Sequence, residues 1–318
     1  MNKIVVLGAG GFIGSHLVKS LKQAGNYVIG ADLKNPEFGE SHADEFYIAD
    51  LRDLAAMDRV VPADTYEVYQ LAADMGGAGY IFTGDNDSAI MLNSVSINVN
   101  LLNVMIKKSI NRVFYSSSAC IYPQENQTDS DNPDCRESTA YPANPDSEYG
   151  WEKLFSERLF LAHAKNNGFV ARIARLHNVY GPYGVWNNGK EKVPAALCRK
   201  IALSNGSIDV WGDGNQTRSF LYIDECIEGI QRLMASDCNI PVNLGSDRMI
   251  SINELAGMIA RIAGKQIAIN HIPGPLGVAG RNSNNDLIKE KLGWAPKNNL
   301  EYGLENTYRW IVDQIEKS

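Results

Sequence analysis

Four reactive side chains stand out in this chain: a thiol, a phenol and two amines. Cys120 follows a run of three serines, Tyr149 and Lys153 are four residues apart, and Lys192 lies further along. A phenol held beside an ammonium can take a proton from a hydroxyl group, whereas a separate thiol and amine can move protons on and off carbon. The sequence therefore predicts two kinds of proton transfer in one pocket.

The spacing of Tyr149 and Lys153 predicts a catalytic pair, because residues four apart lie on one face of a helix. A free phenol has a pKa near 10, about three units too high for a base at neutral pH, so roughly 4 kcal/mol of preferential phenolate stabilisation is required. Lys153 can supply part of it. Ser118, at the end of an expected strand, can hold the hydroxyl group that reacts. The alternative is a half-buried aromatic beside a solvated lysine, a spacing that chance produces in many proteins.

Cys120 and Lys192 indicate proton exchange at carbon. A thiol is already a few per cent thiolate at neutral pH, and this fraction rises beside cations. Inversion needs a proton removed from one face of a carbon and returned on the other, which requires two groups. We interpret Cys120 as the base and Lys192 as the matching acid. The ordinary alternatives are a cysteine packed in the core and a solvated loop lysine.

A glycine loop near the start of the chain predicts a dinucleotide site. Gly8, Gly10 and Gly14 follow a short apolar run and open a helical pattern, where backbone N–H groups can meet a pyrophosphate. Asp32 ends the next apolar run, where a carboxylate can accept both ribose hydroxyls and repel a 2′-phosphate. NAD is therefore predicted in preference to NADP. The residues expected to contact it are Gly8, Gly10, Gly11, Phe12, Ile13, Gly14, Asp32, Asp50, Leu71, Ala72, Tyr149 and Lys153.

Short apolar runs alternate with helical patterns along the first two thirds of the chain. This alternation indicates an α/β fold with a Rossmann-type, doubly wound parallel sheet. Apolar runs at 220–234 and 242–244 are expected to return to the sheet. The expected strands are 3–7, 27–31, 45–48, 67–71, 112–116 and 170–176, with helices at 15–23, 93–108 and 148–166.

The sequence after Arg175 is richer in loops and predicts a smaller, discontinuous α/β lobe that closes over a substrate. A helix at 193–203, a helix at 252–263, a strand at 266–271 and a last helix at 300–317 are expected there. The predicted division is a Rossmann domain of residues 1–177 and 217–246, and a substrate-binding lobe of residues 178–216 and 247–318.

Composition limits the classes of partner. The net charge is −7 and the 30 Lys and Arg are spread along the 318 residues, which argues against a nucleic-acid partner. The five cysteines are odd in number and form no CxxC pair, so neither disulfides nor a metal site is expected, and a reducing cytoplasm fits them best. No run reaches the roughly 18 apolar residues of a membrane span, and no leader is expected before Met1.

Taken together, the motifs resemble those of the extended short-chain dehydrogenase/reductase group, which acts on nucleotide sugars. Longer matches resemble the branch of this group that epimerises GDP-hexoses at C3 and C5. The first resemblance rests on 8–14, 32, 71–73, 116–122, 149–153 and 178–182, and the second on 73–77, 118–123, 175–182, 191–200, 211–214, 216–220, 223–226 and 280–283.

The resemblance implies an isomerase that holds NAD tightly. Tyr149 would help to oxidise C4 of the hexose, Cys120 and Lys192 would exchange protons at C3 and C5, and C4 would then be reduced again. GDP-mannose is the implied substrate, GDP-L-galactose or GDP-L-gulose the implied product, and a homodimer through 93–108 and 148–166 the implied assembly. The implied substrate contacts are Gly76, Ser118, Ala119, Cys120, Asn178, Glu191, Lys192, Lys200, Gln216, Arg218 and Arg281, of which Lys200, Arg218 and Arg281 would hold the diphosphate.

Three other functions stay open at this point. A GDP-4-keto-6-deoxymannose epimerase/reductase shares the cysteine motif, but it has His where Lys192 stands and prefers NADPH. Simple C4 epimerisation of a UDP-sugar leaves Cys120 and Lys192 without a task. A non-catalytic protein that senses NAD has no use for all four reactive groups.

Overall fold

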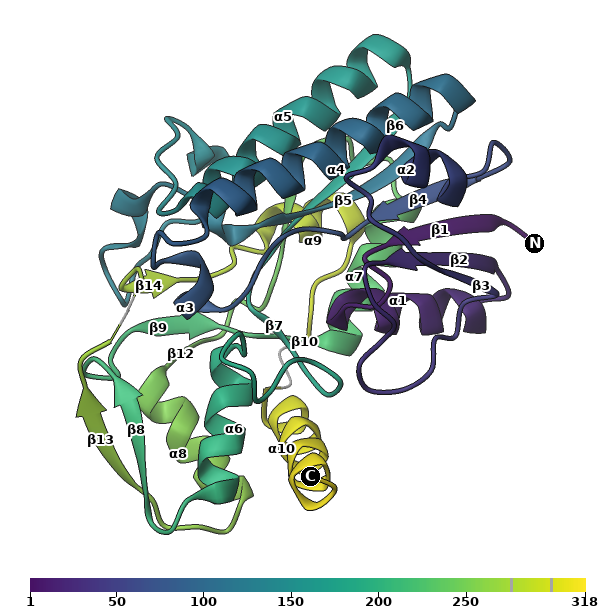
Figure 1. The fold of residues 1–318 in the computed structure, drawn as a ribbon. Helices are drawn as coiled ribbons and strands as arrows, with labels where there is room; N and C mark the ends of the chain where they lie inside the picture. Colours follow the sequence, from purple (N-terminus) through teal and green to yellow (C-terminus); the bar gives the residue numbers. More distant parts are fainter. Residues whose placement is uncertain (275–276, 298–299) are drawn as a thin grey trace.

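The computed structural model describes residues 1–274, 277–297 and 300–318, and its centre is a seven-stranded parallel sheet. The strands stand in the order β11-β6-β5-β4-β1-β2-β3, so the chain starts in the middle of the sheet and winds outward in both directions (Figure 1). The predicted fold class is confirmed. The bounds are β1 Lys3–Leu7, β2 Tyr27–Asp32, β3 Glu45–Ile48, β4 Glu67–Gln70, β5 Arg112–Ser118, β6 Val170–Leu176 and β11 Val242–Leu244.

The sheet is buried on both faces because its central strands are apolar on both sides. In β1, Ile4 and Val6 point into one hydrophobic core, and Val5 and Leu7 point into the other. Helices α1 (Phe12–Gln23) and α7 (Ile223–Ala235) cover the first face. Helices α2 (Leu54–Val60), α4 (Asp87–Lys108) and α5 (Glu148–Asn167) cover the second, as Figure 1 shows.

Helix α4 differs from the sequence expectation that no run could cross a membrane. Among the described residues, α4 is the one helix whose length and apolar composition would allow it to cross a membrane. Its composition is apolar because Ser and Asn, and not charged residues, occupy most of its polar positions. One of these, Asn98, is buried against the protein: its amide donates to Ser156 on α5 over 2.9 Å and its carbonyl accepts from Gln70 on β4 over 2.7 Å. One face of α4 is therefore a core face.

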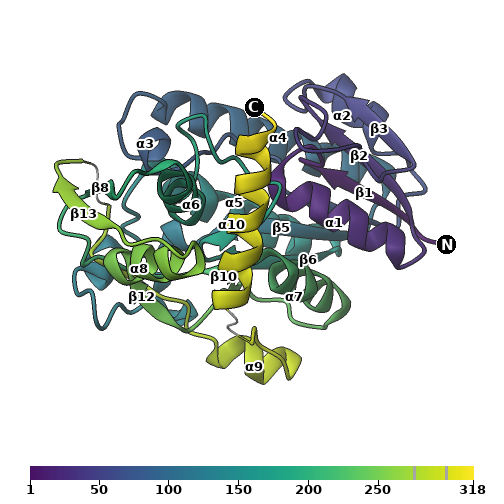
Figure 2. The ribbon, with the colours of Figure 1, turned by 90° about the horizontal axis from the view of Figure 1, so that it is seen from below.

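A smaller lobe lies beyond the carboxyl ends of the strands. It contains β8 (Ser207–Trp211) paired with β13 (Ala268–Ile272), and a three-stranded sheet in which β9 (Thr217–Ser219) lies between β12 (Met249–Ser251) and β14 (Gly280–Arg281). Helix α10 packs against α6 and α8 of this lobe, and Figure 2 shows that the three helices cross at steep angles. The bounds of the remaining helices are α3 Ala78–Ile81, α6 Val193–Leu203, α8 Ile252–Ile262, α9 Asp286–Leu292 and α10 Leu300–Glu316.

The run 220–234 behaves differently from the expectation that it returns to the main sheet. Its first residues form β10 (Leu221–Tyr222), which pairs with β7 (Val179–Tyr180) in a separate two-stranded sheet. The rest is α7, whose apolar side packs under β5 and β6. Only 242–244 joins the large sheet, beside β6. The apolar composition of 220–234 therefore reflects packing against the sheet. Periodicity alone does not distinguish a segment that packs on the sheet from a strand within it.

Candidate active site

A large cavity with a volume of about 1050 Å³ lies where the β strands end. It is lined by the glycine loop, by Asp32, and by Tyr149, Lys153 and Lys192. The carboxyl ends of parallel strands meet at one edge of a sheet, and this edge is where open α/β sheets bind their ligands. Every residue predicted to contact the dinucleotide lines this cavity.

The glycine loop is shaped so that side chains do not fit. Gly8 has φ of +84°, and its N–H donates to the carbonyl of Ala31 over 2.8 Å. A Cβ on Gly14 would lie 2.0 Å from the carbonyl oxygen of Gly8, and a Cβ on Gly10 would lie 2.2 Å from that of Lys34. The loop therefore leaves its backbone bare at the start of α1, which fits a pyrophosphate at a helix N-terminus.

Replacing Gly14 with Ala is expected to weaken NAD binding by about 10- to 100-fold, because the new methyl group must push the loop away from Gly8. Isothermal titration with NAD measures this. Gly184→Ala is the matched control, since it lines the same cavity but its Cβ would meet only ordinary contacts, at 3.4 Å from the Phe12 ring. Equal affinity in Gly14→Ala and the parent would show that the loop does not hold the cofactor.

Asp32, the carboxylate expected to meet the ribose, lines the cavity at the end of β2. Its Oδ2 accepts from the N–H of Gly10 over 3.0 Å. Burial raises the pKa of its carboxyl group, and hydrogen bonds from backbone N–H groups, including that of Gly10, oppose this rise. The nearby cation Lys34 is paired with Glu37 at 3.0 Å. Asp50, which also lines the cavity, accepts hydrogen bonds from Nε and Nη2 of Arg52 on its two carboxylate oxygens. A carboxylate at the expected ribose position would repel a 2′-phosphate, and the cations Lys34 and Arg52 are already paired, so the site fits NAD.

Tyr149 and Lys153 stand on the first turns of α5, which Ser147 caps by accepting from the N–H of Gly150. The ammonium of Lys153 donates to the carbonyl of Ser116 over 3.0 Å and lies 5.7 Å from the centre of the Tyr149 ring. Burial raises the pKa of the Tyr149 phenol, and a hydrogen bond with Ser118 opposes this rise. The structure thus brings the predicted phenol, ammonium and hydroxyl together.

A buried ionic network behind Lys153 went unnoticed in the sequence. Glu157 receives two hydrogen bonds from Arg175, at 3.0 and 2.9 Å, and one from the hydroxyl of Ser117. Burial lowers the pKa of Lys153, whereas the carboxylates of Glu152 and Glu157 raise it. These two carboxylates therefore help to keep the ammonium charged. Glu157 follows Lys153 by four residues on α5, so helical spacing could have indicated this carboxylate from the sequence.

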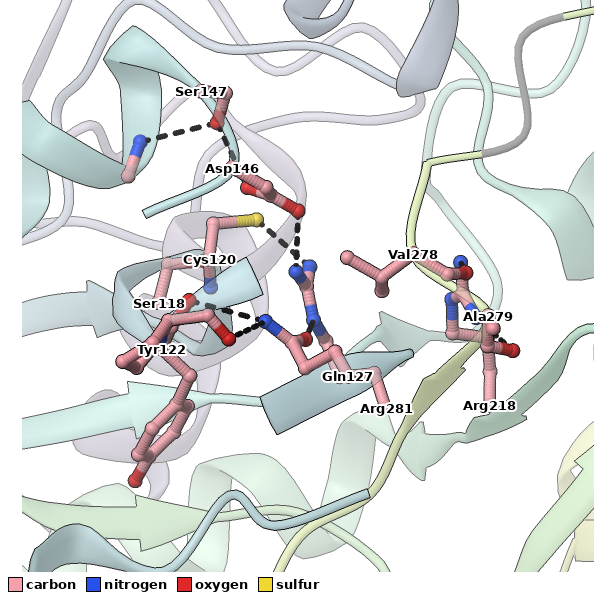
Figure 3. Close-up of polar contacts among 12 residues, drawn as sticks. Ser118, Cys120, Tyr122, Gln127, Asp146, Ser147, Arg218, Val278, Ala279 and Arg281 are labelled. Atoms are coloured by element: carbon pink, nitrogen blue, oxygen red, sulfur yellow. Dashed lines mark hydrogen bonds and ion pairs between the residues drawn. The ribbon is translucent and has the colours of Figure 1, made fainter. Parts of the chain in front are cut away.

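Cys120 lies on a short 3₁₀ turn, Ala119–Ile121, directly after β5. Its N–H donates to the hydroxyl oxygen of Ser118 over 3.1 Å, and its Sγ accepts from the guanidinium of Arg281 over 3.1 Å (Figure 3). Cys120 is not among the residues that line the large cavity. It stands beside that cavity, because Ser118, which lines it, accepts from the Cys120 N–H, and Cys120 packs against the cluster that contains Tyr149.

Lys192 occupies the N-cap position of α6 without a capping hydrogen bond from its side chain, and it lines the cavity. Burial lowers the pKa of its ammonium, and the thiols of Cys120 and Cys226 oppose this shift. The structure therefore places an amine with a weakened hold on its proton within electrostatic range of Cys120. The preceding Glu191 is tied down by Arg199 at 2.7 Å, which holds the segment that carries Lys192.

The other predicted substrate contacts are divided between two places. Gly76 and Asn178 line the cavity, and Asn178 adopts φ of +39° while its amide donates to the carbonyl of Ser219. The remainder do not line it, and most are engaged with the smaller lobe: Ala119, Glu191, Lys200, Gln216, Arg218 and Arg281. Lys200 donates to the carbonyl of Asp209, for example. The substrate roles of this second set stay predictions.

The fold, the glycine cradle and the Tyr149–Lys153 pair define a class of protein. Residues 4–245 match the family model described as the NAD dependent epimerase/dehydratase family. The chain belongs to this family, whose cofactor, NAD, is the one that the cradle fits.

Curated relatives resemble the chain over almost its whole length. GDP-mannose 3,5-epimerase from Arabidopsis thaliana is 50% identical over 317 residues, which are 99% of this chain and 83% of that protein. GDP-mannose 3,5-epimerase 1 from Oryza sativa subsp. indica is 48% identical with the same coverage. More distant is a UDP-glucuronic acid decarboxylase 1 from Xenopus tropicalis, at 28% identity over 99% of this chain and 73% of that protein.

Solved structures share the whole fold. UDP-glucose 4-epimerase from Thermotoga maritima, solved with UDP-glucose, has a TM-score of 0.87 and 26% identity, and the match covers 98% of this chain and 99% of that one. UDP-glucuronic acid 4-epimerase from Bacillus cereus, solved with UDP-glucuronic acid and NAD, has a TM-score of 0.81 and 26% identity with the same coverage. These likenesses extend to both the sheet domain and the smaller lobe.

Proposed function

We propose that this protein is an NAD-dependent GDP-mannose 3,5-epimerase with tightly held NAD. The observation that carries the proposal is that Tyr149, Lys153 and Lys192 line one cavity, with Cys120 beside it, packed against the cluster that contains Tyr149. The similarity of about half of all residues to plant GDP-mannose 3,5-epimerases supports the choice of substrate.

The first step is oxidation at C4 of the hexose. The chemistry that NAD supplies when bound is reversible acceptance of a hydride from this carbon. The chain's part is to hold the C4 hydroxyl with Ser118 and to take its proton on the Tyr149 phenolate. Because burial raises the pKa of this phenol, the positive charge of Lys153 is needed to favour the phenolate.

The second step is proton exchange on the neighbouring carbons. A ketone at C4 acidifies the hydrogens on C3 and C5, since the carbanion is delocalised as an enolate. Cys120 takes a proton from one face and Lys192 returns one to the other, which inverts the carbon. The lowered pKa of Lys192 suits this role, because a weaker hold on the proton makes the ammonium a stronger acid. Return of the proton from Tyr149 and of the hydride to C4, together with loss of a proton from Cys120 to solvent and gain of one by Lys192, completes the cycle.

Incubation of the purified protein with GDP-mannose in deuterated water tests this proposal. With no cofactor added, we expect deuterium at C3 and C5 by NMR, together with new epimers, because both carbons exchange protons with solvent. Failure of any deuterium to enter, in a protein that carries NAD, would contradict it. Turnover of a GDP-4-keto-6-deoxy sugar only on addition of NADPH would instead support the epimerase/reductase alternative.

We also propose a homodimer formed through α4 and α5. These helices lie side by side on the outer face of the sheet domain. Three large apolar side chains on these two helices remain exposed: Leu92 is 67% exposed, Phe155 49% and Trp151 39%. Three large apolar groups on one pair of adjacent helices favour burial against a second copy.

Replacing Phe155 with Glu is expected to convert the dimer to a monomer. A carboxylate buried without a partner costs about 3 kcal/mol, which raises the dissociation constant roughly 100-fold. Light scattering during gel filtration measures the mass. Leu203→Glu on α6 is the control, because Leu203 is 56% exposed and lies on the other lobe. A parent protein that elutes as a monomer would disprove the assembly.

A further inference from the structure

We propose that Asp146 is a positioning residue for the Cys120 thiol, and that it acts through Arg281. This inference rests on the proposed function, since it concerns how the proton exchange at carbon is organised. Figure 3 shows the three side chains converging from different parts of the fold: Cys120 after β5, Asp146 before α5, and Arg281 on β14.

The backbone of Cys120 is fixed, which leaves its side-chain torsion as the main freedom of the sulfur. Its N–H donates to the hydroxyl oxygen of Ser118, which anchors the turn to the end of β5. On the other side, Gly150 of α5 packs on its carbonyl so closely that a Cβ on Gly150 would lie 2.2 Å from that oxygen. Rotation about the Cα–Cβ bond therefore decides whether Sγ faces the sugar.

Arg281 restricts this rotation. Its Nη1 lies 3.1 Å from Sγ, and because a guanidinium carries donors only, the sulfur must be the acceptor. A guanidinium can hold the sulfur in one place only if it is itself held. Two acceptors do this: Nε donates to Oε1 of Gln127 over 2.5 Å, and Nη2 donates to Oδ2 of Asp146 over 2.6 Å. All three nitrogens are thus used, and each in a different direction.

Asp146 is the charged member of this clamp. The side chains of Arg281 and Asp146 are 7% and 4% exposed, so water does not compete for either partner. A charge-assisted hydrogen bond under these conditions is short and strong. Asp146 is also next to Ser147, whose hydroxyl donates to Asp146 Oδ1 over 3.1 Å and caps the helix that carries Tyr149. The same segment therefore orients both proton-transfer groups.

The clamp also connects the two parts of the molecule. Arg281 belongs to β14, which pairs with β9 in the smaller lobe, whereas Cys120 and Asp146 belong to segments around β5 and α5. Gly280 packs tightly here too, since a Cβ on it would lie 2.4 Å from the carbonyl oxygen of Asp129. The thiol is therefore oriented only when the smaller lobe is docked on the sheet domain.

The test compares two partial reactions in the Asp146→Asn variant, which keeps the shape and one acceptor oxygen but removes the charge. With GDP-mannose, reduced-nicotinamide absorbance reports oxidation at C4, and deuterium wash-in reports exchange at C3 and C5. We expect the ratio of exchange to oxidation to fall about 10- to 100-fold, less than the roughly 10²- to 10⁴-fold that the acid or base itself contributes, because the thiol is still present. Little change in KM is expected. Asp146→Glu, which keeps the ion pair but moves the guanidinium, is expected to show a smaller fall.

Asp134→Asn is the matched control, because it removes a carboxylate from another Arg pair in the same region, with Arg136 at 2.7 Å on the surface. The ratio should stay at the parent value there. An unchanged ratio of exchange to oxidation in both Asp146 variants would overturn the inference. A rise in KM alone would also overturn it, because that result would mean that Arg281 binds the diphosphate. A parent protein without oxidation or exchange would instead contradict the proposed function, so the two failures are distinguishable.

Discussion

The Tyr149→Phe variant is expected to lose both oxidation at C4 and deuterium exchange at C3 and C5, by about 10²- to 10⁴-fold in turnover. Exchange depends on the ketone, so removal of the group that helps to form the ketone must stop both processes together. The ring of Phe keeps the packing of Tyr149, which is 7% exposed, and binding of the sugar is expected to change little. Reduced-nicotinamide absorbance and deuterium wash-in measure the two processes in one sample.

Tyr66→Phe serves as the comparison, because Tyr66 is 47% exposed and packs against Arg112 at the opposite end of the sheet. It should behave as the parent. Exchange that persists in Tyr149→Phe at the parent rate would mean that another group removes the C4 proton, and the catalytic assignment of the Tyr149–Lys153 pair would be wrong.

The Lys192→Met variant is expected to separate the two halves of the reaction. Met keeps the length of the side chain but cannot donate or accept a proton, so inversion at carbon should fall about 10²- to 10⁴-fold. Oxidation at C4 does not need Lys192 and should continue. A 4-keto hexose is therefore expected to accumulate on the enzyme, and trapping with borodeuteride followed by mass spectrometry detects it.

Lys165→Met, at the exposed end of α5, controls for the loss of a positive charge. If Lys192→Met instead exchanges deuterium at the parent rate, then the amine is not the acid. If oxidation fails together with exchange, then Lys192 serves substrate binding or the shape of the cavity, and its partnership with Cys120 loses its main support.

Local patterns predicted most of the sheet domain. The strands at 3–7 and 170–176 and the helix at 193–203 occur with the predicted bounds, because short segments rich in β-branched and other apolar residues and a Pro at the first helical turn are strong local signals. Short helices were not predicted. Helices α2 and α9 have seven residues each, about two turns, and a periodic pattern of this length does not stand out from loop sequence.

The start of α4 shows a different reason for error. The expected helix at 93–108 begins six residues earlier, at Asp87. The first turn carries no side-chain cap from Asn86, so the usual start signal is absent, and the polar residues at 85–88 looked like a loop. Tertiary packing of Ile90, which is fully buried, extends the helix beyond what local propensity indicated.

The sequence by itself determined the glycine cradle, the position of the Asp32 carboxylate and the Tyr149–Lys153 pair, because local chain geometry fixes all three. Each of these depends on residues a few positions apart, or on strands that must be neighbours in a doubly wound sheet. Only the tertiary structure decided the partners of these groups. Glu157 meets Arg175 because α5 packs on β6, and Arg281 reaches Cys120 across 161 positions because β14 docks beside the end of β5. Contacts of this range depend on sheet order and on the docking of the smaller lobe, which no local pattern of residues encodes.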